Sequence, residues 1–254
     1  MATGPAKAMI FQTGVLRTQA LPHRPCPTLF FFPGLRSMPV WDAEDEALAT
    51  DKRFRWLQDI QQPEVIAALS REHAALVRAG VPSDYSTRDG TRETGEHKMH
   101  SGDWSWRTYV SKGERRAGFA EACPAAATLL DDVVGDSLMV GTPFSFAFFS
   151  TLHARSSIAP HAAPCNLRLR VHLPLEPTPA QSLGAGVDEC GMRVGAERVA
   201  WETGKPVLFD DSYEHETWNR TEADRLVLLF DVWHPDLSLS ERLAIVDMFD
   251  SLKK

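Results

Sequence analysis

The sequence predicts a mainly β fold (α+β): an antiparallel sandwich or jelly-roll barrel with helices at its N- and C-terminal ends. From about residue 137 onward, short apolar runs of strand length follow one another, separated by Gly, Pro and polar residues. Helical spacing of apolar residues occurs nearer the two ends. The 254 residues, 43% of them hydrophobic, are enough for one sizeable core. A barrel of this kind has room inside for a metal and a small ligand.

The first predicted helix covers residues 63–79. Pro63 suits the first helical position, and Gly80 can end the helix. Its expected apolar face consists of Val65, Ile66, Leu69, Leu76 and Val77.

A second helix is predicted at the end of the chain. Ser238 and Glu241 have the spacing of a capping box, which marks a helix start. Its expected apolar face consists of Leu243, Val246 and Phe249. The polar segment 81–100, which contains Asp89-Gly90, predicts a loop or a weak hairpin.

Four apolar runs are predicted to be strands: residues 144–152, 166–175, 205–210 and 226–232. The second run alternates strictly between two kinds of residue. Its apolar face holds Leu167, Leu169, Val171 and Leu173, and its polar face holds Arg168, Arg170 and His172. If the apolar face packs into the core, the polar side chains point together to water or into a cavity. Cationic groups at this spacing repel one another unless an anion lies among them, so the run predicts an anion site. A solvated basic strand edge is the alternative.

The charge and cysteine content exclude several classes of protein. A net charge of −7 gives no basic face for nucleic acid, and no apolar run approaches the roughly 20 residues that span a bilayer.

Residues 1–41 contain Lys and Arg but no Asp or Glu. We expect a flexible arm over residues 1–27 and a single domain over residues 28–254. A cytoplasmic location is favoured, and organelle targeting is the alternative. The cysteines form no CxxC pair and are expected to be free thiols.

Two histidines, His161 and His215, are the candidate metal ligands. Each lies at the edge of a predicted strand or loop, and imidazole suits iron, zinc or copper. In many non-haem iron oxygenases a carboxylate two residues after the first histidine completes the site, and here that position is Ala163. Taken alone, this motif argues against an iron site with three protein ligands.

Several long motifs, in this order and spacing, resemble the aspartyl/asparaginyl β-hydroxylase family. They lie at residues 32–35, 159–161, 166–175, 201–205, 209–218, 225–226 and 231–235. The resemblance covers about residues 28–243. It implies a double-stranded β-helix, a cupin-like jelly roll, and chemistry that uses Fe(II), 2-oxoglutarate and O2. It also bears on Ala163, because eukaryotic members have a small residue there and bind iron through two histidines only.

The resemblance implies a role for each of five site residues. His161 and His215 correspond to the iron ligands. Ser150 and Arg225 correspond to residues that bind the distal carboxylate of 2-oxoglutarate, and the planar fork of arginine suits a carboxylate. His172 corresponds to a histidine near the other carboxylate of the co-substrate.

On the substrate side, the resemblance makes Arg170, with His172, a predicted catalytic residue. Arg170 corresponds to the arginine that holds an acidic side chain of the substrate. Trp104 corresponds to a tryptophan that lines the substrate cleft, with Trp106 or a plain core role as alternatives. Cys123 matches the first cysteine of a family disulfide whose second cysteine is absent here. This absence weakens the inference that the substrate is an epidermal-growth-factor-like domain.

We therefore expect hydroxylation of an unactivated C–H bond, most simply the β-carbon of an aspartyl or asparaginyl residue in a peptide or protein. A lipid acyl chain or a small molecule is the alternative substrate. Halogenation is an alternative reaction, because Ala163 in place of a carboxylate opens a coordination position for chloride. A non-catalytic binding barrel and zinc hydrolysis are the other classes, although His234 is a poor third zinc ligand because it precedes Pro235. No feature of the sequence specifies an oligomeric state.

Overall fold

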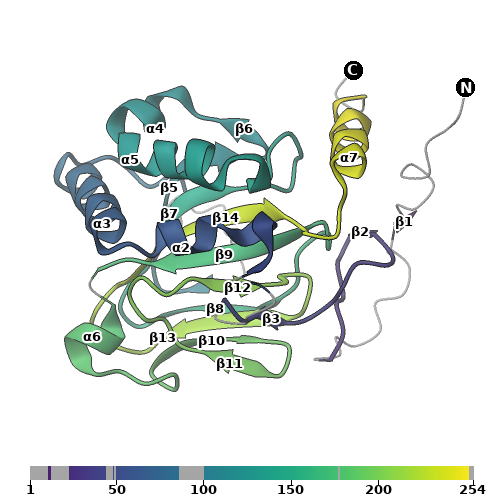
Figure 1. Ribbon diagram of the computed structural model, residues 1–254. Helices are drawn as coiled ribbons and strands as arrows, with labels where there is room; N and C mark the ends of the chain where they lie inside the picture. Colours follow the sequence, from purple (N-terminus) through teal and green to yellow (C-terminus); the bar gives the residue numbers. More distant parts are fainter. Residues whose placement is uncertain are drawn as a thin grey trace, which may run out of the picture.

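The computed structural model describes residues 11–12, 23–43, 48, 50–85, 100–176 and 178–251, and within them two antiparallel sheets form a jelly-roll sandwich (Figure 1). The seven-stranded sheet has the order β3 (Val40–Trp41), β12 (Val207–Phe209), β9 (Arg168–Pro174), β14 (Arg225–Trp233), β7 (Ala147–Leu152), β5 (Trp104–Ser111) and β6 (Glu114–Arg115). The five-stranded sheet has the order β11 (Glu197–Val199), β10 (Cys190–Val194), β13 (His215–Asn219), β8 (Ser156–His161) and β4 (His100–Ser101). A further pair joins β1 (Phe11–Gln12) to β2 (Phe30–Phe31). The predicted jelly roll is confirmed.

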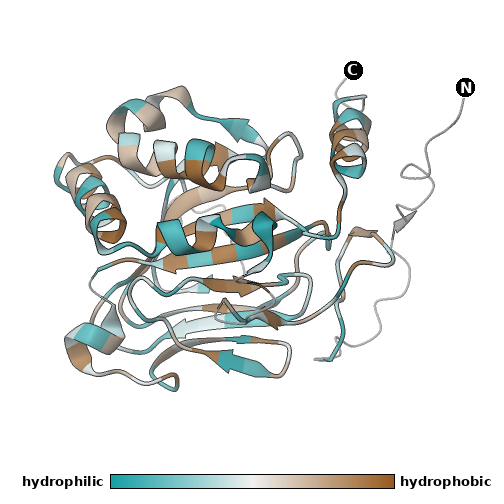
Figure 2. Cartoon of the chain, viewed as in Figure 1, coloured by the Kyte–Doolittle hydropathy of each residue, from teal (hydrophilic) through white to brown (hydrophobic). Residues whose placement is uncertain are grey.

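Helices cover the outer face of the seven-stranded sheet (Figure 1). They are α2 (Trp56–Ile60), α3 (Pro63–Arg78), α4 (Ala117–Ala122), α5 (Pro124–Thr128) and a π-helical turn, η4 (Leu129–Val134). Short 3-10 turns, η2 (Lys52–Phe54) and η5 (Gly135–Ser137), and the helices α6 (Pro179–Leu183) and α7 (Leu239–Ser251) complete the chain. The strongest hydrophobic colouring lies on the central strands beneath these helices (Figure 2).

Strand β9 shows both faces that its alternation predicted. Leu169, Val171 and Leu173 are buried in the core between the sheet and the helices. Arg168 and His172 lie on the opposite face, between the two sheets, and are only 3% and 6% exposed. The alternative of a solvated strand edge was wrong, because β9 is a central strand that pairs with β12 on one side and β14 on the other.

The first predicted helix is confirmed as α3, with one error on its apolar face. Ile66, Leu69 and Leu76 are buried, whereas Val77 is 50% exposed. The assignment of Val77 to this face was wrong, because the buried stripe of α3 that contains Ile66, Leu69 and Leu76 does not include it.

The terminal helix is confirmed as α7, and so is its capping box. The Glu241 N–H donates to Ser238 Oγ at 3.3 Å, and the Ser238 N–H donates to Glu241 Oε2 at 2.8 Å. The helix buries Ile245 and Phe249, while Leu243 is 61% exposed, so Leu243 was wrongly assigned to its apolar face.

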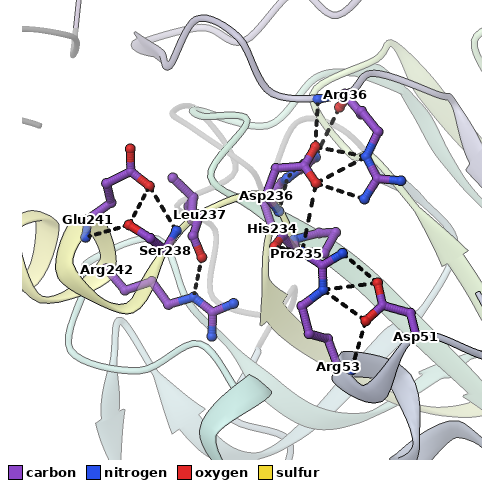
Figure 3. A network of polar contacts seen from close by, with 10 residues as sticks. All are labelled: Arg36, Asp51, Arg53, His234, Pro235, Asp236, Leu237, Ser238, Glu241 and Arg242. Atoms are coloured by element: carbon purple, nitrogen blue, oxygen red, sulfur yellow. Dashed lines mark hydrogen bonds and ion pairs between the residues drawn. The ribbon is translucent and has the colours of Figure 1, made fainter.

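A polar clasp fastens the N-terminal segment to the end of β14 (Figure 3). Arg36 binds Asp236 with Nη2 and Oδ1 2.7 Å apart, and the buried His234 lies 3.0 Å from the carbonyl oxygen of Arg36 through Nε2. Nearby, Arg53 pairs with Asp51 and donates to the carbonyl of Pro235. The clasp holds β2 and β3 against the body of the sandwich.

Two predictions lie largely outside the described residues: the arm over residues 1–27 and the loop over residues 81–100. The domain boundary at residue 27 falls within the described residues and stays a prediction. Within the described part of the arm, the Cys26 N–H donates to the carbonyl of Ser212 at 2.7 Å. All four cysteines are free thiols, as expected. Among the described helices, none is long and apolar enough to cross a membrane.

Candidate active site

His161 and His215 face each other across two paired strands. His161 ends β8 and His215 begins β13, and the antiparallel register places them directly opposite, with ring centroids 4.1 Å apart. His161 Nδ1 lies 2.8 Å from the carbonyl oxygen of Ala159, and His215 Nδ1 lies 2.9 Å from that of Tyr213. Because a carbonyl only accepts, Nδ1 carries the proton in both rings, and the lone pair is on Nε2. This is the tautomer in which Nε2 can bind a metal.

The surroundings of this pair suit a metal with two protein ligands. Burial, then the neighbouring His161, lowers the pKa of His215 well below its usual range, so its imidazole is neutral at pH 7. Nowhere in the described part of the chain do three His, Cys, Asp or Glu side chains come together as a metal cluster. Ala163 is buried, and its N–H donates to the carbonyl of Asp211 at 2.7 Å. The residues present therefore supply two imidazoles and leave the other coordination positions to ligands.

Arg225 lies on the inner face of β14 with unsatisfied hydrogen-bonding capacity. It is 1% exposed, and its Nε and Nη1 atoms have no hydrogen-bond partner among the described residues. Its guanidinium carbon lies 4.7 Å from the ring centroid of Trp201. Burial lowers the pKa of Arg225 to about 10, which still leaves it charged at pH 7. An unpaired buried cation is unfavourable, so this position suits an anionic ligand.

Ser150 is a diagonal neighbour of Arg225 on the same face of the sheet. Arg225 lies opposite Leu152, and Ser150 lies opposite Val227, one step along the pair of strands. Ser150 is buried, and its Oγ accepts a hydrogen bond from Nε1 of Trp104 at 2.9 Å. The register thus places Ser150 next to Arg225 on one face of the sheet, and the Ser150 hydroxyl is hydrogen-bonded to Trp104.

His172 lies between Arg225 and the two facing histidines. Trp201 Nε1 donates to His172 Nδ1 at 3.3 Å, so the ring proton of His172 is on Nε2. Burial, then Arg225 and Arg170, lowers the pKa of His172 well below its usual range, which keeps the ring neutral. The ring of Phe209 lies 5.0 Å from that of His172.

A continuous series of ring contacts therefore lines the space from the histidine pair to Arg225. The Phe209 ring also lies 5.6 Å from that of His215, and the Trp201 ring lies 6.1 Å from that of His172. Five of the residues predicted from the sequence thus border one interior region. These are Ser150, His161, His172, His215 and Arg225.

Arg170 lies in a buried ion network that the sequence analysis missed. Arg168 binds Asp211 at 2.6 Å and Asp231 at 2.9 Å, and Arg170 binds Asp231 at 2.8 Å and Asp211 at 3.3 Å. Although burial acts to raise the pKa of Asp211, Arg168 and Arg170 lower it overall, so the carboxylate stays charged. The anion expected among the cationic side chains of β9 is supplied by the protein itself. The sequence did contain one signal for this network: Asp231, a carboxylate within the predicted strand at residues 226–232.

The part of the chain that contains these site residues is similar to known proteins. A sequence model of the aspartyl/asparaginyl beta-hydroxylase family matches residues 70–235, which is more than half of the chain and includes every site residue described above. The chain belongs to the aspartyl/asparaginyl beta-hydroxylase family.

Three relatives of this chain carry different names. The chain is 28% identical over 218 residues to human aspartyl/asparaginyl beta-hydroxylase, covering 86% of this chain but 26% of the human protein. It is 28% identical to aspartate beta-hydroxylase domain-containing protein 2 of Rattus norvegicus, covering 88% of this chain and 59% of that protein. It is also 28% identical to the ornithine lipid ester-linked acyl 2-hydroxylase of Rhizobium tropici, covering 72% and 58%. The chain therefore spans about a quarter to three fifths of these relatives.

Proposed function

We propose that this member of the aspartyl/asparaginyl beta-hydroxylase family is a dioxygenase that uses Fe(II), 2-oxoglutarate and O2 to hydroxylate an unactivated C–H bond. The proposed target is the β-carbon of an aspartyl or asparaginyl residue in a peptide or protein. The observation that carries the proposal is Arg225, a buried arginine that shares one interior region with the facing pair His161 and His215. Two of its nitrogens have no partner in the part of the chain that the structure describes.

The residues of the site fit iron and 2-oxoglutarate. His161 and His215 would hold the iron through Nε2. Arg225 and Ser150 would bind the distal carboxylate, because a guanidinium and a hydroxyl are both good donors to a carboxylate. His172, neutral with its proton on Nε2, would donate to the other carboxylate. When bound, the iron would activate O2, the oxidant, with electrons that 2-oxoglutarate supplies on its decarboxylation to succinate, and the protein would position the reactants and exclude water.

Arg170 is the proposed contact for an acidic substrate side chain. Its side chain is 16% exposed, and its charge is already shared with two carboxylates. The attraction of Arg170 for an anion is therefore weaker than that of Arg225, and we expect it to orient the substrate more than to bind it. A small error in orientation, on the order of 1 Å, can lower the rate about 100-fold.

Other reactions are less well supported. The relatives named above are hydroxylases, so halogenation at the position opened by Ala163 and a non-catalytic barrel are not favoured. Zinc hydrolysis requires a third protein ligand, and the described residues offer no such cluster. An acyl chain is the alternative substrate, because the Rhizobium relative matches this chain at the same identity as the human one.

The decisive experiment is anaerobic titration of the protein with Fe(II), followed by 2-oxoglutarate, observed by visible absorption. A weak charge-transfer band that requires both ligands, and that disappears in H161A and H215A variants, would support the proposal. Fe(II) binding and 2-oxoglutarate turnover at the full rate in either variant would disprove the ligand assignment. Turnover with acidic peptides, compared with acyl-lipid substrates, then decides the substrate class.

A further inference from the structure

We infer that Trp104 is a positioning residue for the co-substrate: its indole N–H fixes the direction of the Ser150 hydroxyl, so that Ser150 donates to the distal carboxylate beside Arg225. This inference rests on the proposed function. It assigns Trp104 to the 2-oxoglutarate pocket, whereas the family resemblance placed it on the substrate side.

The inference starts from the direction of the hydrogen bond between Trp104 and Ser150. An indole N–H can only donate, so the bond of 2.9 Å from Trp104 Nε1 makes Ser150 Oγ the acceptor. The hydroxyl proton of Ser150 must then point elsewhere. Ser150 is 1% exposed, and Trp104 is the one side-chain partner of its Oγ in the described part of the chain. Water is therefore largely excluded, and the proton points into the interior that Arg225 borders.

The register of β5, β7 and β14 places Ser150 between Trp104 and Arg225. Trp104, Leu152 and Arg225 lie opposite one another on β5, β7 and β14, and Ser150 is the diagonal neighbour of both outer members. Diagonal neighbours are within reach of an aromatic side chain. Trp104 thus reaches Ser150 from one side, while Arg225 lies on the other side of the same hydroxyl.

Neighbouring aromatic rings hold the indole in place. The ring of Trp104 lies 5.1 Å from that of Tyr85 and 4.8 Å, edge-on, from that of Trp106. Tyr85 in turn stacks on Trp106 at 4.6 Å, and its hydroxyl lies 2.9 Å from Nδ1 of His100. A ring packed on two sides keeps one rotamer, so its N–H can act as a fixed donor.

A polar tie on the opposite face of the sheet holds the same three strands in register. Ser105 Oγ lies 2.8 Å from His153 Nε2, and His153 Nδ1 lies 3.0 Å from Asp224 Oδ2. These three residues directly follow or precede Trp104, Leu152 and Arg225 in the chain. The tie therefore fixes the three strands at the level of Trp104, Leu152 and Arg225.

The test is a W104F variant with W106F as its matched control. Both variants replace a partly buried tryptophan of β5, but Trp106 Nε1 is buried without a hydrogen-bond partner in the described structure, so W106F breaks no such bond. The anaerobic titration measures Fe(II) and 2-oxoglutarate affinity separately. We expect W104F to weaken 2-oxoglutarate binding about 5- to 10-fold, the size of one hydrogen bond, with Fe(II) affinity unchanged. W106F keeps the Trp104–Ser150 hydrogen bond and an aromatic ring beside the indole, so it should leave Fe(II) affinity unchanged and weaken 2-oxoglutarate binding much less than W104F does.

Two further variants keep the test decisive. Incorporation of benzothienylalanine at position 104 replaces the N–H by sulfur at almost constant shape, and it should weaken 2-oxoglutarate binding as W104F does, even where the phenylalanine variant folds poorly. The double variant W104F/S150A should bind 2-oxoglutarate no more weakly than S150A, because Trp104 acts through Ser150. Additive losses would overturn the inference.

The outcomes separate this inference from the proposed function. If the wild-type protein binds Fe(II) and 2-oxoglutarate but W104F and the benzothienylalanine variant bind as tightly as W106F, the role of Trp104 is wrong and the proposed function stands. If the wild-type protein binds no 2-oxoglutarate, both are wrong.

Discussion

Arg225 is buried and charged, and two of its nitrogens have no hydrogen-bond partner among the described residues. It therefore opposes folding at the place where it would serve ligand binding. Replacing a buried ion pair by apolar side chains of similar volume is often stabilising by about 1–4 kcal/mol, and Arg225 carries the same desolvation cost. We expect R225M to raise the midpoint of thermal unfolding of the ligand-free protein. The same variant should weaken 2-oxoglutarate binding by about 100-fold or more, because charge-assisted bonds contribute roughly 1.5–3 kcal/mol each.

The measurements for R225M are thermal unfolding without ligands and the anaerobic 2-oxoglutarate titration. R198M is the matched control, because Arg198 lies on the exposed strand β11 and pairs with Asp188. That control should change neither quantity by much. A destabilised R225M protein that binds 2-oxoglutarate normally would contradict the interpretation of Arg225 as an anion site.

At the scale of elements, β9 shows both how far a sequence can predict structure and where it stops. The alternation of residues 166–175 predicted its two faces correctly, because side chains alternate along any strand. The same pattern could not identify which anion balances the arginines. Asp231 lies opposite Arg170 because of the register between β9 and β14, and Asp211 reaches Arg168 from a loop. Both carboxylates are far from the arginines in the sequence. Long-range pairing of this kind leaves no periodic signal.

The same limit applies to the helices and to the site. The strong spacing of apolar residues and the caps predicted α3 and α7, whereas α2, α4 and α5 have only five or six residues, too few for a helical period to appear. The proposed metal ligands, His161 and His215, were predicted through a family resemblance, and so were Ser150, His172 and Arg225. Two partners of these residues could not be predicted from the sequence. Trp201, which sets the tautomer of His172, and Trp104, which we infer sets the direction of the Ser150 hydroxyl, follow only from three-dimensional contacts.

The ion network of β9 and β14 gives a prediction about stability. Asp231 is fully buried, binds both Arg168 and Arg170, and accepts the Phe146 N–H at 3.0 Å. Removing its charge leaves two buried cations to share one remaining carboxylate, Asp211. We expect D231N to lower the free energy of unfolding by about 3–5 kcal/mol, the usual effect of breaking a buried pair. Urea denaturation measures the change.

E216Q provides the comparison for D231N on the other sheet. Glu216 pairs with Arg193 at 2.6 Å, but both side chains are partly exposed. Solvent screening limits such pairs to about 1 kcal/mol or less. Equal losses of stability in D231N and E216Q would show that the buried network contributes no more than a surface ion pair.

At the scale of the whole molecule, several buried histidines make the fold sensitive to acid. Burial lowers the pKa of His73 and His234 to about 4, and it lowers the pKa of His172 and His215 well below their usual range. The unfolded chain takes up protons on these rings as the pH falls through about 6.5, whereas the folded protein does not. The stability that His73 and His234 contribute is complete above about pH 6.5 and is lost as the pH falls from about 6.5 to 4.

His73 allows this contribution to be measured for a single ring, because it lies on α3, outside the site. It contacts Phe149 edge-on at 5.4 Å and lies 3.3 Å from Thr151 Oγ1. In H73F the aromatic contact remains but the titration is removed. Between pH 7.5 and 5.5 the metal-free H73F protein should lose about 1 kcal/mol less unfolding free energy than the wild type. H23Q, a substitution at an exposed histidine, is the control. An H73F protein with the wild-type pH dependence would mean that His73 binds its proton equally in the folded and unfolded chain, and that the acid sensitivity resides in the other buried rings.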